Sequence, residues 1–178
     1  MPVKILLPRL TVILLTIILF TIAPNAWSAS FTIVDGQFVT SQQTLLDPGD
    51  TGTINSGGDL TTSVIAIATS ASNITVLNNG AITTNRTSGY GIYLAGNSGT
   101  NTITSNGTIT TLRAKSYGIY SNANSGTETI SSSGTVTTTK VKGYGIYSNA
   151  NSGTSTFTNS GTITTSGTTG YGIYSNAN

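Results

Sequence analysis

Residues 117–143 read YGIYSNANSGTETISSSGTVTTTKVKG, and residues 144–170 read YGIYSNANSGTSTFTNSGTITTSGTTG. The two segments align without a gap, and each is 27 residues long. The string Y-G-I-Y that opens them recurs every 27 residues, at Tyr90, Tyr117, Tyr144 and Tyr171. A fixed period of this kind is typical of repeat architectures, in which each repeat forms one structural unit.

Each unit predicts three short strands separated by turns. Thr, Ile, Val and Tyr favour strands, whereas Asn, Ser and Gly favour bends. The first strand is Y-G-I-Y, the second surrounds one apolar position, and the third is G-T-[IV]-T-T. The apolar position recurs at Val76, Ile103, Ile130 and Phe157. The third string recurs at Gly107, Gly134 and Gly161, after G-A-I-T-T at Gly80. No segment shows a helical period of ten or more residues.

Stacking of these units predicts the fold. One unit holds too few apolar side chains to fold alone, so neighbouring units must bury a shared core. In a parallel β-solenoid each strand bonds to its copies ~4.8 Å above and below, and identical side chains align. Parallel crossovers are right-handed in almost all cases. The sequence therefore predicts an all-β fold, a right-handed parallel β-helix with one 27-residue repeat per coil. One buried column should contain Ile92, Ile119, Ile146 and Ile173.

A disordered, low-complexity chain is the alternative, since low charge with much Ser, Gly and Asn is also typical of flexible linkers. The fixed period of the Ile and Tyr positions argues against it.

Upstream of residue 90 the repeat decays, although Ile65 still precedes Ile92 by 27 residues. The stretch FTIVDGQFVT (residues 31–40) alternates around an Asp-Gly turn and predicts a β-hairpin. A hairpin there would cap the first coil and protect its strand edges. We expect a cap and first degenerate coil over residues 29–60, followed by β-helix repeats over residues 61–178 in an array truncated at the C-terminus.

The N-terminal segment, residues 1–28, has the three parts of a secretory signal peptide. Lys4 and Arg9 supply the positive charge, and the apolar run LTVILLTIILFTIA follows. This run is short for a membrane span of ~20 residues. Ala26 and Ser28 then provide small residues at the −3 and −1 positions. The sequence predicts export through the Sec machinery and cleavage after Ser28; an uncleaved N-terminal anchor is the alternative.

Composition excludes several functions. The chain has no Cys and no His, which excludes Cys/His metal sites, haem ligation by these residues and His-based proton relays. Beyond Lys4 and Arg9, 7 − 2 = 5 basic residues balance 5 acidic residues, which disfavours a nucleic-acid partner. The acidic residues share no repeat phase: Asp35, Asp47, Asp50, Asp59 and Glu128. We therefore expect no enzyme activity, catalytic residue, cofactor or metal in this segment.

Several features together resemble one family. An export signal, a capping strand pair, the stretch LLDPGDTGTINSGG (residues 45–58) and runs of N-x-G-x-I-T-T and Y-G-I-Y resemble the N-terminal, β-helical passenger region of bacterial autotransporters of type V secretion. The resemblance implies a surface or extracellular location, reached with an outer-membrane β-barrel translocator. That barrel would be the chain's own C-terminus or a separate protein, as for two-partner-secreted haemagglutinin-like exoproteins. These motifs describe a fold rather than an activity.

The first candidate site is a basic stripe, formed by Arg86, Arg113 and Lys140 at 27-residue spacing with Lys115 and Lys142 close by. Like charges stacked ~5 Å apart repel by on the order of 1 kcal/mol per pair in a high dielectric, which a solvated loop tolerates. One interpretation is structural: exposed cations deter edge-to-edge aggregation and bind nothing. The functional alternative is a binding stripe for anionic glycans or lipopolysaccharide.

The second candidate comprises the eight tyrosines, which occupy two repeat positions. The Tyr90 ladder contains Tyr90, Tyr117, Tyr144 and Tyr171, and the Tyr93 ladder contains Tyr93, Tyr120, Tyr147 and Tyr174. Residues three apart in a strand face opposite ways, and Ile92 shares a face with Tyr90. We therefore expect the Tyr90 ladder inside and the Tyr93 ladder outside. An exposed aromatic ladder suits sugar stacking or partner contact, with ordinary packing of strand-forming residues as the alternative.

These features predict a non-enzymatic secreted surface protein, an adhesin or surface stalk, with host or bacterial surface glycans or proteins as partners. Two alternatives stay open. One is the passenger of a polysaccharide-modifying β-helix enzyme with its active residues downstream. The other is a structural component of a surface layer.

Overall fold

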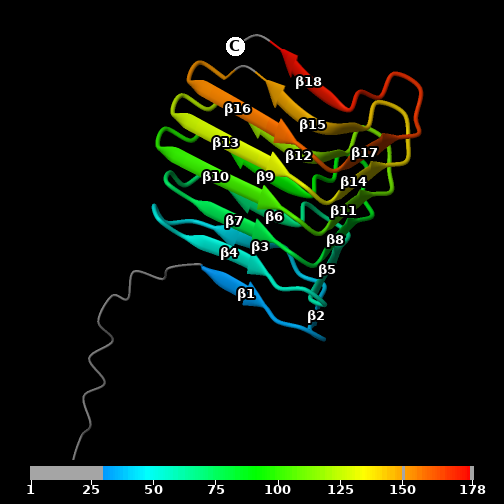
Figure 1. Cartoon of the computed structure of the whole chain (residues 1–178), viewed down its shortest axis with the longest axis horizontal. Helices are drawn as coiled ribbons and strands as arrows, with labels where there is room; N and C mark the ends of the chain where they lie inside the picture. Colours follow the sequence, from blue (N-terminus) through cyan, green and yellow to red (C-terminus); the bar gives the residue numbers. More distant parts are fainter. Residues whose placement is uncertain (1–29, 150, 177–178) are drawn as a thin grey trace, which may run out of the picture.

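The computed structural model of the chain describes residues 30–149 and 151–176. Every regular element in this part of the chain is a β-strand. The strands form three parallel six-stranded sheets, and the chain visits the sheets in turn before it begins the next coil (Figure 1). The predicted parallel β-solenoid is confirmed.

The three sheets are named A, B and C in the order in which the chain visits them. Sheet A contains β1 (Phe31–Ile33), β4 (Thr51–Ile54), β7 (Thr75–Asn78), β10 (Thr100–Ser105), β13 (Thr127–Ser132) and β16 (Thr154–Asn159). Sheet B contains β2 (Phe38–Val39), β5 (Asp59–Thr62), β8 (Ala81–Thr84), β11 (Thr108–Thr111), β14 (Thr135–Thr138) and β17 (Thr162–Thr165). Sheet C contains β3 (Gln43–Leu45), β6 (Ile67–Thr69), β9 (Ile92–Ala95), β12 (Tyr117–Asn122), β15 (Tyr144–Asn149) and β18 (Ile173–Asn176).

Coil length changes along the chain. From β7 onward the register follows the 27-residue repeat, as in the pairs Val76–Ile103, Ile103–Ile130 and Ile130–Phe157. The first coils are shorter: Phe31 pairs with Gly52, and Ile67 pairs with Ile92. The expected alignment of Ile65 with Ile92 is therefore wrong by two residues, because the turns of the early coils contain fewer residues.

The predicted N-terminal hairpin is also wrong. The Asp-Gly turn does form, since the Gln37 N–H donates to the Val34 carbonyl oxygen (3.0 Å) and Gly36 has a φ of 72°. The strands on either side of it do not pair with each other. Instead β1 pairs in parallel with β4, and β2 with β5. The turn is thus a corner between sheets A and B, and each short strand bonds to the coil above.

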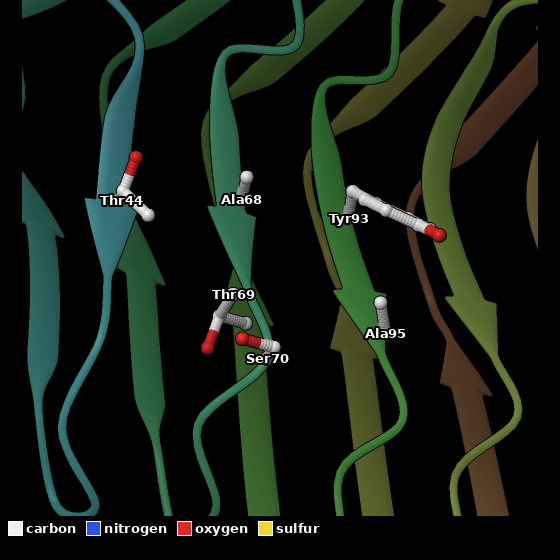
Figure 2. A pocket seen from close by; sticks show the side chains of 6 residues that line it. All are labelled: Thr44, Ala68, Thr69, Ser70, Tyr93 and Ala95. Atoms are coloured by element: carbon white, nitrogen blue, oxygen red, sulfur yellow. The ribbon is translucent and has the colours of Figure 1, made fainter.

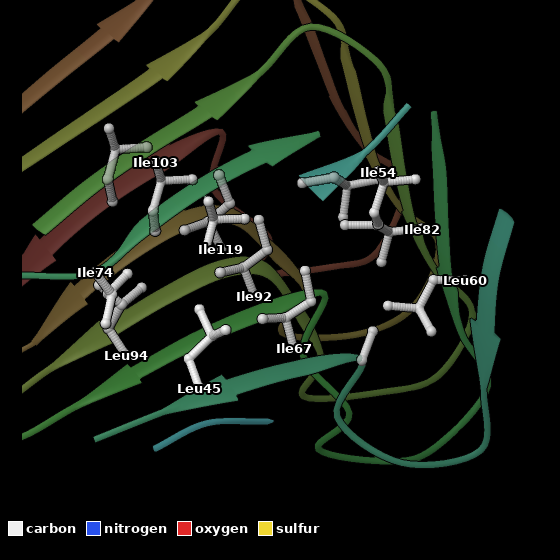
Figure 3. Close-up of a cluster of buried hydrophobic side chains, with 14 of the residues drawn as sticks. Leu45, Ile54, Leu60, Ile67, Ile74, Ile82, Ile92, Leu94, Ile103 and Ile119 are labelled. Atoms are coloured by element: carbon white, nitrogen blue, oxygen red, sulfur yellow. The ribbon is translucent and has the colours of Figure 1, made fainter. Parts of the chain in front are cut away.

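A continuous column of aliphatic side chains fills the interior (Figure 3). Ile92, Ile119 and Ile146 lie in register in sheet C and are fully buried, as predicted. Ile173 pairs with Ile146 as expected but is 46% exposed, so its predicted burial is wrong. Burial of a side chain of this size stabilises the fold by about 1.5–3 kcal/mol relative to exposure. Repetition of one Ile position therefore supplies each coil with the core that it lacks alone.

The interior becomes polar in the later coils, near the corner between sheets C and A. The inward position that holds Leu94 in β9 holds Ser121 in β12 and Ser148 in β15. Beside it, the Asn124 side-chain oxygen accepts the Asn97 N–H of the coil below (2.9 Å). The same bond recurs one coil higher, where Asn151 accepts from the Asn124 N–H (2.8 Å). Side-chain hydrogen bonds between coils therefore replace apolar contacts here.

The predicted signal peptide, residues 1–28, lies outside the described residues. Within residues 30–149 and 151–176, no helix has the length and apolar character needed to cross a membrane.

Candidate functional site

The basic stripe lies at the corner where the chain leaves sheet B for sheet C. Arg86 follows β8, Arg113 and Lys115 follow β11, and Lys140 and Lys142 follow β14. All five side chains are exposed. The structure therefore places these cations on three successive loops of one edge.

Local geometry keeps the loops of the basic stripe in register. Lys115 and Lys142 both have a φ of 55°, in the left-handed region, and the N–H of Lys115 donates to the Val141 carbonyl of the next loop (3.0 Å). Arg113 Nε donates to Asn85 Oδ1 in the loop below (2.8 Å). The loop sequences contain no acidic residue, so the edge has one sign of charge. Such an edge attracts anions, and salt screens the attraction.

The tyrosines lie together on the outer face of sheet C. The expected inward position of the Tyr90 ladder is wrong, because its rings contact those of the outward Tyr93 ladder. Tyr117 stacks on Tyr144 with 5.0 Å between ring centroids, and Tyr120 stacks on Tyr147 at the same separation. Between the ladders, Tyr117 meets Tyr147 edge to face at 5.0 Å. Offset stacks and edge-to-face pairs are the favoured aromatic geometries.

A break in strand alternation explains why both ladders face outward. Gly118 and Ile119 are both buried, so Tyr117 and Tyr120, although three residues apart, project to the same side. A Cβ on Gly118 would collide with Val136 Cγ1 and the Gly145 carbonyl oxygen. Glycine therefore allows two consecutive residues to face the interior at this corner. The Y-G-I-Y string contained this signal in its glycine.

A row of asparagines runs beside the tyrosines and accepts hydrogen bonds from their hydroxyl groups. Tyr120 donates to Asn122 Oδ1 (3.2 Å), and Tyr147 donates to Asn149 Oδ1 (3.1 Å). Asn149 Nδ2 in turn donates to Asn122 Oδ1 of the coil below (2.8 Å). The outer face of sheet C is thus uncharged, aromatic and rich in hydrogen-bonding groups.

Ring packing raises the pKa of the central tyrosines. Burial is the main cause, and neighbouring phenol groups add to it, so that the pKa of Tyr117 and of Tyr120 reaches about 12. The same two causes raise the pKa of Tyr90 and Tyr144. These phenols therefore stay protonated at neutral pH and can donate hydrogen bonds.

The buried position of Glu128 was not predicted from the sequence. Its side chain is fully buried on β13, where Oε2 accepts a hydrogen bond from Ser121 (2.5 Å) and a longer one from Ser155 (3.4 Å). Among the described residues, Oε1 has no hydrogen-bond partner. Burial raises the pKa of Glu128, against the lowering effect of the two serines.

The two candidate surfaces are the basic stripe and the tyrosine face of sheet C, and neither contains a nucleophile–base pair. Comparison with protein-family models, with curated proteins and with solved structures finds no match for this chain.

Proposed function

We propose that this chain is a non-enzymatic, exported surface protein of the autotransporter-passenger type, and that it works as an adhesin or surface stalk. The observation that supports this proposal is the repetition of one side chain at one place on successive coils. A rod built in this way presents many equivalent groups along a line. Weak contacts repeated along a rigid line add through avidity, which is what adhesion requires.

The basic stripe is the part of this surface suited to acidic glycans. Arg113, Lys115, Lys140 and Lys142 lie on two adjacent loops and are exposed. Successive coils lie ~4.8 Å apart, so a polyanion lying along the edge could meet several cations at once. The binding is micromolar or weaker and decreases with salt, because the charges are solvated.

Binding of the purified exported chain to dextran sulfate, with unmodified dextran as the comparison, tests this proposal. The parent should bind the sulfated polymer in a salt-sensitive manner. The variant Arg113→Ser/Lys115→Ser/Lys140→Ser/Lys142→Ser should lose this binding. The charge-conserving variant Arg113→Lys/Lys115→Arg/Lys140→Arg/Lys142→Arg should keep it. Binding that is indifferent to the serine changes would leave the stripe as a solvated loop.

The export part of the proposal has its own measurement. Mass analysis of the exported protein should find a chain that begins at Ala29. Detection of intact residues 1–28 on that protein would contradict the predicted cleavage.

A further inference from the structure

The tyrosine face ends abruptly on the coil that contains β9. Tyr120 lies in register with Tyr93, and Tyr93 lies in register with Ala68 of β6. Ala68 in turn pairs with Thr44 of β3. The outward position thus changes from a large ring to small side chains in one step.

The asparagine row ends at the same place. Asn122, which accepts a hydrogen bond from the Tyr120 hydroxyl, lies in register with Ala95 of β9. The amide of the asparagine row is therefore replaced by a methyl group on this coil. Because both rows stop together, the surface has a hollow of about 160 Å³ (Figure 2). Its lining residues are Thr44, Ala68, Thr69, Ser70, Tyr93 and Ala95.

Tyr93 presents an aromatic face that the middle tyrosines lack. Tyr120 stacks between Tyr93 and Tyr147, with ring centroids 5.1 and 5.0 Å away, so both of its faces are covered. Tyr93 has one stacked neighbour, Tyr120, and meets Tyr90 of its own coil at a tilt, with ring centroids 5.3 Å apart. On its other side the register position holds Ala68, and Figure 2 shows the Tyr93 ring leaning away from Ala68. A ligand can therefore stack on the Tyr93 ring, on the side of Ala68, but not on the covered faces of the middle tyrosines.

The chemistry of the hollow selects its ligand. An aromatic ring and two alanine methyl groups form apolar walls, while Thr44 and Ser70 carry hydroxyl groups that can donate or accept hydrogen bonds. The Thr69 side chain is buried, and its hydroxyl oxygen accepts a hydrogen bond from the Ala71 N–H (3.0 Å). No charged side chain lines it. The volume is below the ~300 Å³ at which pockets for drug-sized ligands begin, which favours a single ring. A neutral sugar ring has this character, with an apolar C–H face and a rim of hydroxyl groups.

We propose that this hollow is a binding site for one neutral pyranose residue, stacked on the free face of Tyr93. The proposal rests on the proposed surface-binding function and names a ligand class different from the polyanion of the basic stripe. The site is small and open, so an isolated sugar binds weakly, with a dissociation constant on the order of millimolar. Repetition of the sugar along a glycan-coated surface would compensate for this weakness.

Titration of the isotope-labelled protein with neutral methyl glycosides, followed by NMR, tests the site. Methyl galactopyranoside, methyl glucopyranoside and methyl N-acetylglucosaminide are the probes, and N-acetyltyrosine amide represents a peptide ligand. At least one glycoside should shift the amide signals of β6 and β9 in a saturable manner. Saturation-transfer signals should be strongest for the C–H protons of the sugar.

Two variants remove the site in opposite ways. Tyr93→Ala deletes the ring, and Ala68→Tyr continues the row of tyrosines by one coil and fills the hollow. Each should weaken glycoside binding at least tenfold, whereas Tyr93→Phe keeps the ring face and should keep most of the affinity. The dispersed amide spectrum of Ala68→Tyr verifies that the variant is folded.

The contrary outcomes are distinct. If no glycoside binds the folded parent, if Ala68→Tyr binds as the parent does, or if only N-acetyltyrosine amide binds, the pyranose site is refuted. Dextran sulfate binding is independent of these changes, so its persistence would show that only the pyranose proposal fails.

Discussion

The coils before residue 90 and those after it share one fold but differ inside and outside. The earlier coils have a mainly aliphatic interior, including Leu45, Ile54, Leu60 and Ile67, with isolated buried polar side chains such as Thr69. They have small side chains on the outer face of sheet C. The later coils carry large tyrosines outside, and part of their interior is polar. The comparison shows that successive coils of a solenoid can be held together by apolar packing in the interior or by stacked side chains on the outer face. Stacked rings and side-chain ladders offset what the later interior lacks in apolar area.

The largest expected effect comes from a charge placed in the shared aliphatic column. Ile146→Asp would bury a carboxylate between two coils, at a cost of several kcal/mol. The matched control is Thr137→Asp at an outward, partly exposed position of β14, which should change stability little. Thermal unfolding followed by circular dichroism measures both. A parent-like melting temperature for Ile146→Asp would mean that this column faces solvent.

Exchange of residues at one inward position of sheet C, which holds Leu94 in β9 and Ser121 in β12, sharpens the comparison. Leu94→Ser should cost about 2–5 kcal/mol, as for other large-to-small changes in a core. The reverse change, Ser121→Leu, should also destabilise, because Ser121 donates to Glu128 and accepts from Asn124 and Asn151 (2.6 and 2.8 Å). Urea unfolding of both variants measures the two costs. An increase in stability in Ser121→Leu would show that the polar interior is dispensable.

The polar interior should also confer a pH dependence through Glu128. Burial raises its pKa in the folded state, so the folded protein holds this proton more tightly than the unfolded chain. Its contribution is full below the unfolded value of about 4.3 and is lost as the pH rises through the folded value. Glu128 should therefore make the parent less stable at neutral pH than near pH ~4.

The variant Glu128→Gln should remove this part of the pH profile, measured by urea unfolding across the pH range. Asp35→Asn, at an exposed position in the first coil, is the control and should keep the parental profile. Identical profiles for Glu128→Gln and the parent would contradict the buried position of the carboxylate.

The smallest effect concerns ionisation of the tyrosine face. The pKa of Tyr117 and Tyr120 is raised to about 12, so phenolate absorbance of these residues should appear late in an alkaline titration. In the unfolded chain all tyrosines should ionise near the ordinary value of about 10. The stability gained from these two groups is present below that value and is lost as the pH rises through about 12. Coincident native and urea-unfolded titration curves would refute the packed rings.

Much of the fold was predictable because a strict period leaves little freedom in register. The Y-G-I-Y and G-T-[IV]-T-T strings, with the recurring apolar position between them, placed the three sheets correctly, and three of the four residues of the Ile column are buried as predicted. The first coils were not predictable from that period, since a shorter turn changes the alignment without changing the strand pattern. The hairpin prediction failed for a similar reason: alternation around Asp35 and Gly36 is the same whether the strands pair with each other or with the next coil.

The candidate surfaces were predictable in part. Spacing alone grouped the five cations and the eight tyrosines. The shared outward face of the tyrosines depends on the two consecutive inward residues Gly118 and Ile119, which a simple two-residue alternation does not allow. The hollow beside Tyr93 depends on which residue of an irregular coil lies below the ring. The register of β6 against β9 places Ala68 there rather than Ala66.

The register of the sheets has a mechanical consequence. Each strand bonds only to the coils directly above and below it, so force applied along the chain should detach one coil at a time. Release of 27 residues lengthens an extended chain by about 95 Å, at ~3.5 Å per residue. The pair Phe31–Gly52 closes a shorter loop, which would release about 75 Å. A stretched molecule would thus unfold in equal steps through the later coils and in shorter steps at the first ones. It would lengthen under load before all of its coils had unfolded.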